Sequence, residues 1–246
     1  MTSAPVFLVD PLPAGDHFVL DGPEGRHAAT VRRLRPGEEL LLSDGRGSVA
    51  ECVVSSVAGR DALELELGRR WTEPVPSPRI VVVQALVKGD RGELAVELAT
   101  EVGADAIVPW RAARCVVRWE DGPRGVKALE RWRSTAREAA KQSRRAWVPE
   151  VSPPVTTEGL ADLVRTAAGA LLLESSTATR VTNVALPTKG NLLVLVGPEG
   201  GISTEEKALL EGAGARLVRL GPTVLRTSTA GAVAVGVLAV LTGRWR

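Results

Sequence analysis

The chain has 246 residues, of which 44% are hydrophobic and 24% charged, and its formal net charge is +2. A chain of this length and composition can bury a sizeable apolar core, so we expect a globular protein of one or two domains. The two cysteines, Cys52 and Cys115, form no CxxC pair, which argues against a disulfide framework or a zinc site and favours buried apolar roles. The two histidines fit no HExxH motif, so we expect neither a metal hydrolase nor a Ser-His-Asp triad.

The first part of the chain is predicted to be a small β-rich domain. Short apolar segments, each bounded by Gly, Asp or Pro turn residues, are the predicted strands: 6–9, 39–44, 48–57 and 62–68. Pro74, Pro76 and Pro78 then occupy alternate positions within 69–79, a pattern that cannot pair inside a sheet and is typical of an extended linker. We therefore place a domain boundary here, between one domain at 1–72 and another at 73–246.

Apolar runs alternate with helical stretches in the rest of the chain. The apolar runs are the predicted strands: 80–86, 106–110, 170–175, 191–197 and 215–220. The predicted helices lie near 90–102 and 124–143 and begin at 204 and at about 228. Continuous apolar strands between helices indicate a parallel sheet covered on both faces, which is an α/β fold.

The last apolar segment, 229–243, raises the question of a membrane. It is shorter than the roughly 20 apolar residues that a membrane-spanning helix needs, so we interpret it as a buried helix. Its Ala and Gly residues suit close helix packing, either within the chain or across a subunit interface. The N-terminus carries no export signal, and we expect no membrane association and a cytoplasmic location.

The stretch "LVGPEGGISTEE", residues 195–206, joins an apolar run to a helix start. Ser203 and Glu206 form a predicted capping box, so the loop leads from a strand end into a helix, the usual ligand position in an open α/β sheet. The loop lacks both GxxxxGK[ST] and GxGxxG, and Glu199 would repel a polyphosphate. The glycines allow a ligand to approach the backbone, although they could also simply form a tight turn.

A second unusual stretch, "LGPTVLRTSTAGA" at 220–232, places Arg226 in mostly apolar company. An arginine in such surroundings is seldom left without a partner. Arg226 therefore either pairs within the protein, with Glu199 as the candidate, or is directed at a substrate.

These two stretches resemble the C-terminal signature motifs of the RsmE family, the 16S ribosomal RNA uridine N3-methyltransferases of the SPOUT superfamily. The resemblance extends along the chain. Residues 26–47, "RHAATVRRLRPGEELLLSDGRG", are similar to the family's N-terminal PUA-like domain, and 83–110 and 131–151 match its internal blocks. Two positions depart from the pattern, since Thr223 stands where the family usually has arginine and Ser228 where it has glutamate.

The resemblance implies an N-terminal PUA-like β-barrel domain and a C-terminal SPOUT α/β domain with a deep trefoil knot. It also implies that S-adenosylmethionine binds in the knot, and that Arg226 acts on the target base. The residues expected at the cofactor are Leu173, Glu174, Gly197, Pro198, Glu199, Gly200, Gly201, Ile202, Leu220, Gly221, Leu225, Thr227 and Ala230. A sulfonium and ribose hydroxyls tolerate a nearby carboxylate where a polyphosphate would not.

Two groups of basic residues are candidate contacts for RNA. The first group is Arg26, Arg32, Arg33 and Arg35, and the second is Arg133, Arg137, Lys141 and Arg144. Spacings of three and four residues place the second group on one predicted helix face. A basic stripe is the electrostatic pattern expected for RNA binding, although a solvated helix face with intrachain partners such as Glu138 is the commoner outcome for a single charge run.

The function that these resemblances imply is methyl transfer from S-adenosylmethionine to N3 of a uridine in 16S rRNA of the small ribosomal subunit, by a homodimer without a metal. The departures at Thr223 and Ser228 leave an alternative open, in which the chain is a non-catalytic RNA-binding or ribosome-assembly factor.

Overall fold

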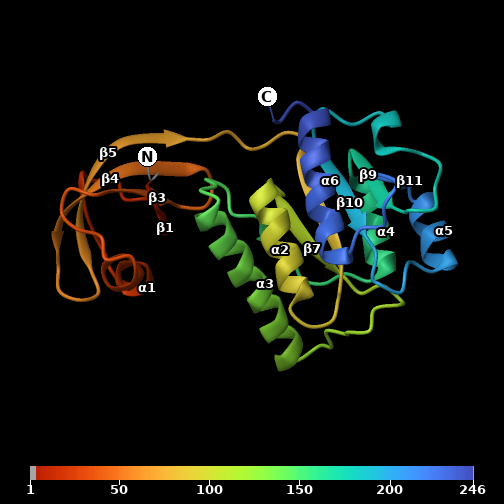
Figure 1. Ribbon diagram of the computed structural model, residues 1–246, viewed down its shortest axis with the longest axis horizontal. Coiled ribbons are helices and arrows are strands. Elements are labelled where there is room, and N and C mark those ends of the chain that lie inside the picture. The colour runs from red at the N-terminus through yellow and green to blue at the C-terminus, as the bar shows by residue number, and fades with distance from the viewer. Residues whose placement is uncertain (1–3, 246) are drawn as a thin grey trace. The chain divides into compact units, whose positions relative to one another are not determined.

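The computed structural model describes residues 4–245, which divide into two compact units (Figure 1). The first unit comprises the chain up to Val75 together with Ala140–Val148, and the second comprises Pro76–Ala139 and the chain from Pro149 onwards. Residues 140–148 belong to the first unit because of tertiary contacts, which no local sequence pattern predicts. Val148, for example, donates its backbone N–H to the carbonyl of Gly45 at 3.0 Å.

The first unit is built on a five-stranded sheet with the order β1-β3-β4-β5-β2. Its strands are β1 (Val6–Leu8), β2 (His17–Leu20), β3 (Glu39–Ser43), β4 (Ser48–Val57) and β5 (Leu63–Thr72), and all pair antiparallel except β1 with β3. A short helix α1 (Gly22–Arg26) and a π-helical turn η1 (His27–Val31) connect β2 to β3. Alternate residues of β4 and β5, such as Cys52 and Leu65, point into one core, as the period of a half-buried strand requires.

The four strands predicted in this unit are confirmed, with two corrections. Strand β2 was missed because its four residues, HFVL, are too short a segment for alternation to stand out. Strand β5 continues to Thr72, so residues 69–72 are part of the sheet and not of the predicted linker. The alternate prolines begin only after the strand ends, which agrees with their inability to donate to a sheet ladder.

The second unit contains a six-stranded sheet in the order β11-β9-β10-β6-β7-β8, with every strand pair parallel. The strands are β6 (Arg79–Ala85), β7 (Ala106–Trp110), β8 (Glu150–Val151), β9 (Gly169–Leu173), β10 (Asn191–Val196) and β11 (Arg216–Val218). The helices are α2 (Arg91–Val102), α3 (Pro123–Gln142, whose last residues belong to the first unit), α4 (Thr157–Thr166), α5 (Thr204–Gly212), α6 (Thr227–Leu241) and the 3-10 turn η2 (Val181–Asn183). The predicted α/β architecture with a parallel sheet is confirmed.

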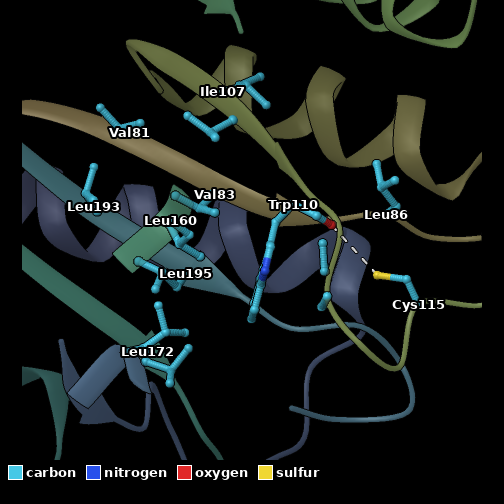
Figure 2. Close-up of a cluster of buried hydrophobic side chains, with 14 of the residues drawn as sticks. Val81, Val83, Leu86, Ile107, Trp110, Cys115, Leu160, Leu172, Leu193 and Leu195 are labelled. Atoms are coloured by element: carbon cyan, nitrogen blue, oxygen red, sulfur yellow. Dashed lines mark hydrogen bonds between the residues drawn. The ribbon is translucent and has the colours of Figure 1, made fainter. Parts of the chain in front are cut away.

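Helices cover both faces of this sheet, and alternate residues of the central strands explain why. In β10, Leu193 and Leu195 join the cluster that contains residues of α3, α4 and α5, and Figure 2 shows both beside Leu160 of α4. Leu192 and Val194 point the other way, into a second cluster with residues of α6. A strand that is buried on both faces has no polar side, which is why the sequence shows continuous apolar runs.

Helix α4 was not predicted, although its sequence carries the usual signals. Thr156 caps the helix by accepting a hydrogen bond from the N–H of Gly159 at 3.3 Å, and Leu160 and Val164 are four residues apart on its buried face. Pro153 and Pro154 precede this helix. A threonine followed by apolar residues at helical spacing is sufficient to find such a helix.

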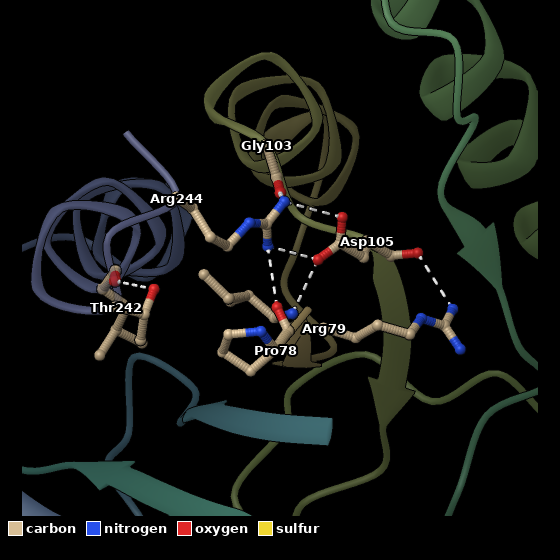
Figure 3. Close-up of polar contacts among 8 residues, drawn as sticks. Pro78, Arg79, Gly103, Asp105, Thr242 and Arg244 are labelled. Carbon is tan, nitrogen blue, oxygen red and sulfur yellow. Dashed lines mark hydrogen bonds and ion pairs between the residues drawn. The ribbon is translucent and has the colours of Figure 1, made fainter. Parts of the chain in front are cut away.

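The C-terminal helix is largely a core element. Nine of its residues are buried, among them Val235 and Leu238, and it packs on α2 and on the sheet. Beyond its end, Arg244 forms a bidentate ion pair with Asp105, and Asp105 also accepts the N–H of Ile80 at 2.8 Å (Figure 3). The residues after α6 are thereby fixed to the start of β6 and the entry of β7. No helix of residues 4–245 is long and apolar enough to span a bilayer.

Candidate active site

A pocket of about 530 Å³ opens where β9, β10 and β11 end and where α6 begins. The strands of the second unit are parallel, so their carboxyl ends meet at one edge of the sheet, and the loops that follow them form the wall of the pocket. Ligands of open α/β sheets bind at this edge. The pocket therefore lies where the two signature stretches were expected to meet.

The structure brings together nearly all the residues predicted to hold a cofactor. Those lining the pocket are Leu173, Glu174, Gly197, Pro198, Glu199, Gly201, Ile202, Leu220, Gly221, Leu225, Thr227 and Ala230, and Arg226 lines it as well. Gly200 is not among the lining residues. A Cβ on Gly200 would lie 3.3 Å from Cβ of Arg114. A side chain at this position would therefore point toward the segment after β7 and not into the pocket.

The loop after β10 is held tightly by its own atoms. A Cβ on Gly197 would lie 2.6 Å from Cγ1 of Ile202, a distance that leaves no room for a side chain. The N–H of Gly201 donates to the carbonyl of Pro198 at 2.9 Å, and Gly201 has φ +74°, which favours glycine. Arg114 donates to the carbonyl of Gly200 at 3.2 Å. Close approach and turn geometry therefore both require glycine in this loop.

The buried carboxylate of Glu206 fixes the end of the same loop. The capping box with Ser203 is confirmed, and Glu206 Oε2 accepts the N–H of Ser203 at 3.1 Å. Glu206 Oε1 accepts two further hydrogen bonds, from the N–H of Ala113 and the hydroxyl of Thr157, both at 2.8 Å. Thr157 in turn accepts the indole N–H of Trp110 at 3.1 Å. One side chain thus joins the loop after β10 to the segment after β7 and to α4.

Glu199 pairs with Arg91 and not with Arg226. Nη1 of Arg91, at the start of α2, lies 3.5 Å from Oε1 of Glu199. Arg226 is exposed, lines the pocket and makes no ion pair with any of residues 4–245. The first of the two roles considered for Arg226, an internal pair with Glu199, is therefore wrong.

Glu174 supplies an ionised carboxylate to the pocket. Burial by itself would raise its pKa, but an ion pair with Lys207 of α5 and hydrogen bonds from the N–H and hydroxyl of Ser176 outweigh burial and lower the pKa below its usual value of 4.5. The carboxylate is consequently charged at neutral pH and can accept hydrogen bonds from a ligand.

Comparison with known proteins places the chain in a family. Residues 74–239 match the model of the RNA methyltransferase domain, and residues 20–68 match the model of the RNA methyltransferase PUA domain. Ribosomal RNA small subunit methyltransferase E of Mycobacterium tuberculosis is 54% identical over 98% of this chain and 94% of that protein. The chain belongs to the ribosomal RNA small subunit methyltransferase E family. The Bacillus subtilis member is 32% identical over 87% of this chain and 86% of its own.

Solved structures of the family share the fold of the whole chain. Methyltransferase E of Neisseria gonorrhoeae, bound to S-adenosylmethionine, has a TM-score of 0.85 and 28% identity over 97% of this chain and 98% of its own. A Legionella pneumophila methyltransferase in complex with the same cofactor has a TM-score of 0.86 and 26% identity over 98% of both chains. The family and its PUA domain are thus confirmed, whereas the trefoil knot stays a prediction.

The first group of predicted RNA-binding residues lies at the surface of the PUA domain. Arg26, Arg32, Arg33 and Arg35 are all exposed, and they make no ion pair with any of residues 4–245. They occupy the end of α1 and the segment after η1, where Arg33 adopts a left-handed backbone conformation with φ +56°. Four positive charges close together in sequence are therefore directed at solvent.

The second group does not form the predicted stripe on one helix face. Arg144 lies in the turn beyond the end of α3. Lys141 is buried and its Nζ lies 3.0 Å from Oε1 of Glu24. Arg133 is exposed, but it pairs with Glu130 at 2.6 Å and donates to a backbone carbonyl at 3.2 Å. Helical spacing therefore did not predict the surroundings of Lys141 or Arg144, and intrachain contacts involve part of the charge of the group.

Several pocket residues were missed by the sequence reading. They are Arg91, Ser175, Val196, Val218 and Arg219, whereas Thr223 and Val224, which also line the pocket, lie within the second signature stretch that was expected at the cofactor. The position of Arg91 could have been predicted, because it follows the strand at 79–85 and so lies at the same edge of the parallel sheet as the signature loops. The two departures from the family pattern are also now placed: Thr223 lines the pocket, and Ser228 is buried in the first turn of α6.

Proposed function

We propose that this family member methylates N3 of a uridine in 16S rRNA of the small ribosomal subunit, with S-adenosylmethionine as methyl donor. The observation that carries the proposal is the position of Arg226, an exposed guanidinium without an ion pair in the described chain, on the wall of the pocket built from both signature stretches. The resemblance of these stretches to the uridine N3-methyltransferases supplies the target atom.

The residues of the pocket fit S-adenosylmethionine. The ligand is a nucleoside with an amino acid and a sulfonium, so it needs hydrogen-bond acceptors, apolar contact and room against the backbone, and no phosphate site. Glu174 offers an ionised carboxylate, Leu173, Ile202 and Leu225 offer apolar surface, and Gly197 and Gly221 offer backbone without side chains. When bound there, the cofactor supplies a methyl group already activated by the sulfonium.

Arg226 stabilises charge on the target base. Uracil must lose its N3 proton before the nitrogen can be methylated, and negative charge then spreads to the carbonyl oxygens beside it. A guanidinium remains charged at all accessible pH values and offers a rigid fork of donors to such oxygens. Arginine is for the same reason a poor base, so the proton leaves to solvent or to another group.

The exposed arginines of the PUA domain hold the RNA backbone. Arg26, Arg32, Arg33 and Arg35 provide positive charge that phosphates can neutralise, with release of counterions and a strong dependence on salt. Arg133, Arg137 and Arg144 supply further positive charge, although the intrachain contacts of Arg133 leave less of it for RNA. Reversal of charge at Arg32 and Arg33 tests this role, because it should weaken RNA binding and flatten the salt dependence while cofactor affinity is unchanged.

The enzyme acts as a homodimer through α2 and α6. Both helices expose apolar side chains: Leu94 on α2, and Val233, Val240 and Leu241 on α6. Two-fold dimers are the commonest closed assembly, and a self-complementary apolar face suits one. Light scattering should give a mass about twice the 26.0 kDa of one chain. Val240→Glu should lower the measured mass, whereas Val126→Glu, at an exposed position on α3, should leave it unchanged. A monomer mass for the unaltered protein at micromolar concentration would contradict the dimer.

The decisive experiment is methyl transfer to small subunits purified from a strain that lacks the enzyme. A methyl group on N3 blocks Watson–Crick pairing, so reverse transcriptase should stop at one uridine only after incubation with enzyme and S-adenosylmethionine. Arg226→Ala provides the control for contaminating activity. Methyl incorporation without any stop would show that another atom is modified and would end the N3 assignment.

A further inference from the structure

A second hollow, of about 430 Å³, lies next to the cofactor pocket in the same unit. The first turn of α2 borders both, because Arg91 lines the cofactor pocket while Asp90 and Gly92 line the second hollow. Its opposite wall comes from α3 and from the segment after β7, with Trp132 and Trp119 as the largest side chains. The first turn of α2 therefore separates the second hollow from the cofactor pocket.

Two indole rings in this wall are buried against each other, and their N–H groups have no hydrogen-bond partner among residues 4–245. Trp132 is only 2% exposed and Trp119 only 8%, and their rings meet edge to face with centroids 4.9 Å apart. Neither indole N–H donates a hydrogen bond to any of residues 4–245, whereas Trp110 and Trp147 both do. Neither indole nitrogen is among the buried polar atoms that lack a partner in the described chain, so both N–H groups are accessible to solvent, and an acceptor that enters the hollow can take the place of that solvent.

The close fit at Gly92 aims the N–H edge of Trp132 at the first turn of α2. A Cβ on Gly92 would lie 2.9 Å from Cζ2 and 3.0 Å from Nε1 of Trp132. The donor edge of the ring thus packs against the turn that carries Asp90, where only glycine leaves room for the ring.

An unused acceptor lies on the same turn. Asp90 is the N-cap residue of α2, but its carboxylate caps no N–H and forms no ion pair with the described part of the chain. Aspartate at an N-cap normally accepts such a bond. The neighbouring Glu93 is already paired with Arg131 at 3.1 Å, so Asp90 is the acceptor left available to a ligand.

We propose that this hollow binds the guanine base of a nucleotide near the target uridine, an inference that rests on the proposed function. Guanine carries two neighbouring acceptors, O6 and N7, which suit two indole N–H donors. Beside them it carries two neighbouring donors, N1–H and the 2-amino group, which suit one carboxylate. Adenine and uracil lack both pairs, and cytosine lacks the pair of donors. The hollow thus selects the sequence around the uridine, while Arg226 acts on the uridine itself.

The direct test follows the indole N–H signals of the 15N-labelled protein during titration with guanosine monophosphate, and it requires no methyl transfer. Trp119→Phe and Trp132→Phe identify two of the six tryptophan signals. We expect these two to shift with guanosine monophosphate, to shift less with the adenosine, cytidine and uridine monophosphates, and the signal of Trp71 to stay in place. Unmoved signals, or equal shifts with all four nucleotides, would overturn the proposal.

Kinetics provide an independent test. Asp90→Asn and Trp132→Phe should each raise the KM for small subunits about tenfold or more, with kcat and cofactor Kd little changed. The control is Asp162→Asn, at an exposed position on α4, which should change none of these three constants. The melting temperature of each variant shows whether the fold survives. An unchanged KM in folded variants would contradict the guanine site, whereas absence of a reverse-transcription stop with the wild-type enzyme would instead contradict the proposed function.

Discussion

The guanidinium of Arg91 and the carboxylate of Glu199 meet at the wall of the cofactor pocket, with Nη1 and Oε1 3.5 Å apart. This contact joins the first turn of α2 to the loop after β10, two segments separated by most of the second unit in sequence. It also satisfies the one carboxylate that had been a candidate partner for Arg226. The charge of Arg226 is therefore available to a substrate, and its removal should affect turnover more than folding.

Arg226→Ala should lower the methylation rate by about 10²-fold or more, the scale observed when one donor to a developing oxyanion is removed. Cofactor affinity and melting temperature should change little, because the side chain is exposed and has no ion pair to lose. Single-turnover kinetics, calorimetric titration and thermal melting measure the three quantities. Arg216→Ala, at an exposed position of β11 outside the pocket, is the matched control. A normal rate in folded Arg226→Ala would remove Arg226 from the catalytic groups.

Gly221→Val should weaken cofactor binding by about tenfold or more while leaving the fold intact. Gly221 lines the pocket, and a Cβ there would meet no protein atom within 4 Å, so an added side chain fits without disturbing the protein and is free to occupy space that the ligand needs. Gly212→Val is the control, since a Cβ at Gly212 is equally free and lies outside the pocket. Equal cofactor Kd values for the two variants would show that the pocket is drawn in the wrong place. Gly200 is a poorer choice, because a side chain there would press on Arg114.

The buried strands and the start of α5 could be predicted from patterns of a few neighbouring residues. Apolar runs such as 191–197 identify strands buried on both faces, and Ser203 with Glu206 identifies the start of α5, because each signal lies within a few residues. The meeting of the two signature loops also follows from a general rule on parallel sheets. The individual pocket residues, by contrast, were predicted from the resemblance of the two stretches to the RsmE family.

What could not be predicted depends on contacts between distant residues. Lys141 has the spacing of an exposed helix position, but its partner Glu24 is 117 residues away. Likewise, Gly200 lies against Arg114, which is distant from it in the sequence. Glu199 pairs with Arg91 because α2 begins beside the loop after β10. The sequence shows where a charged residue or a glycine lies along the chain, whereas tertiary packing determines which residues it contacts.

Glu206→Ala should destabilise the protein by about 3–5 kcal/mol, because it leaves donors at Ala113, Thr157 and Ser203 without their acceptor in a buried place. It should also weaken cofactor binding, since the loop that ends at Ser203 loses its anchor. Glu205→Ala is the control, because Glu205 is exposed on the same helix turn and holds no buried donor, so its loss should destabilise the protein much less. Chemical denaturation of both variants gives the free energies of unfolding. Equal values would contradict the anchoring role of Glu206.

The ion pair between Glu174 and Lys207 should make stability depend on pH in acid. The pKa of Glu174 is lowered in the folded protein, so its contribution to the free energy of unfolding is present above its unfolded value of about 4.5 and is lost as the pH falls through the folded value. Lys207→Met removes the strongest influence that lowers this pKa. The free energies of unfolding of wild type and variant should therefore differ at pH 7 and converge as the pH falls below the folded pKa of Glu174, which itself lies below 4.5. Lys189→Met, at an exposed position away from Glu174, should follow the wild type throughout. A gap between wild type and Lys207→Met that is constant from pH 7 to pH 3 would mean that Lys207 stabilises the fold by packing alone, and that the charge on Glu174 does not depend on it.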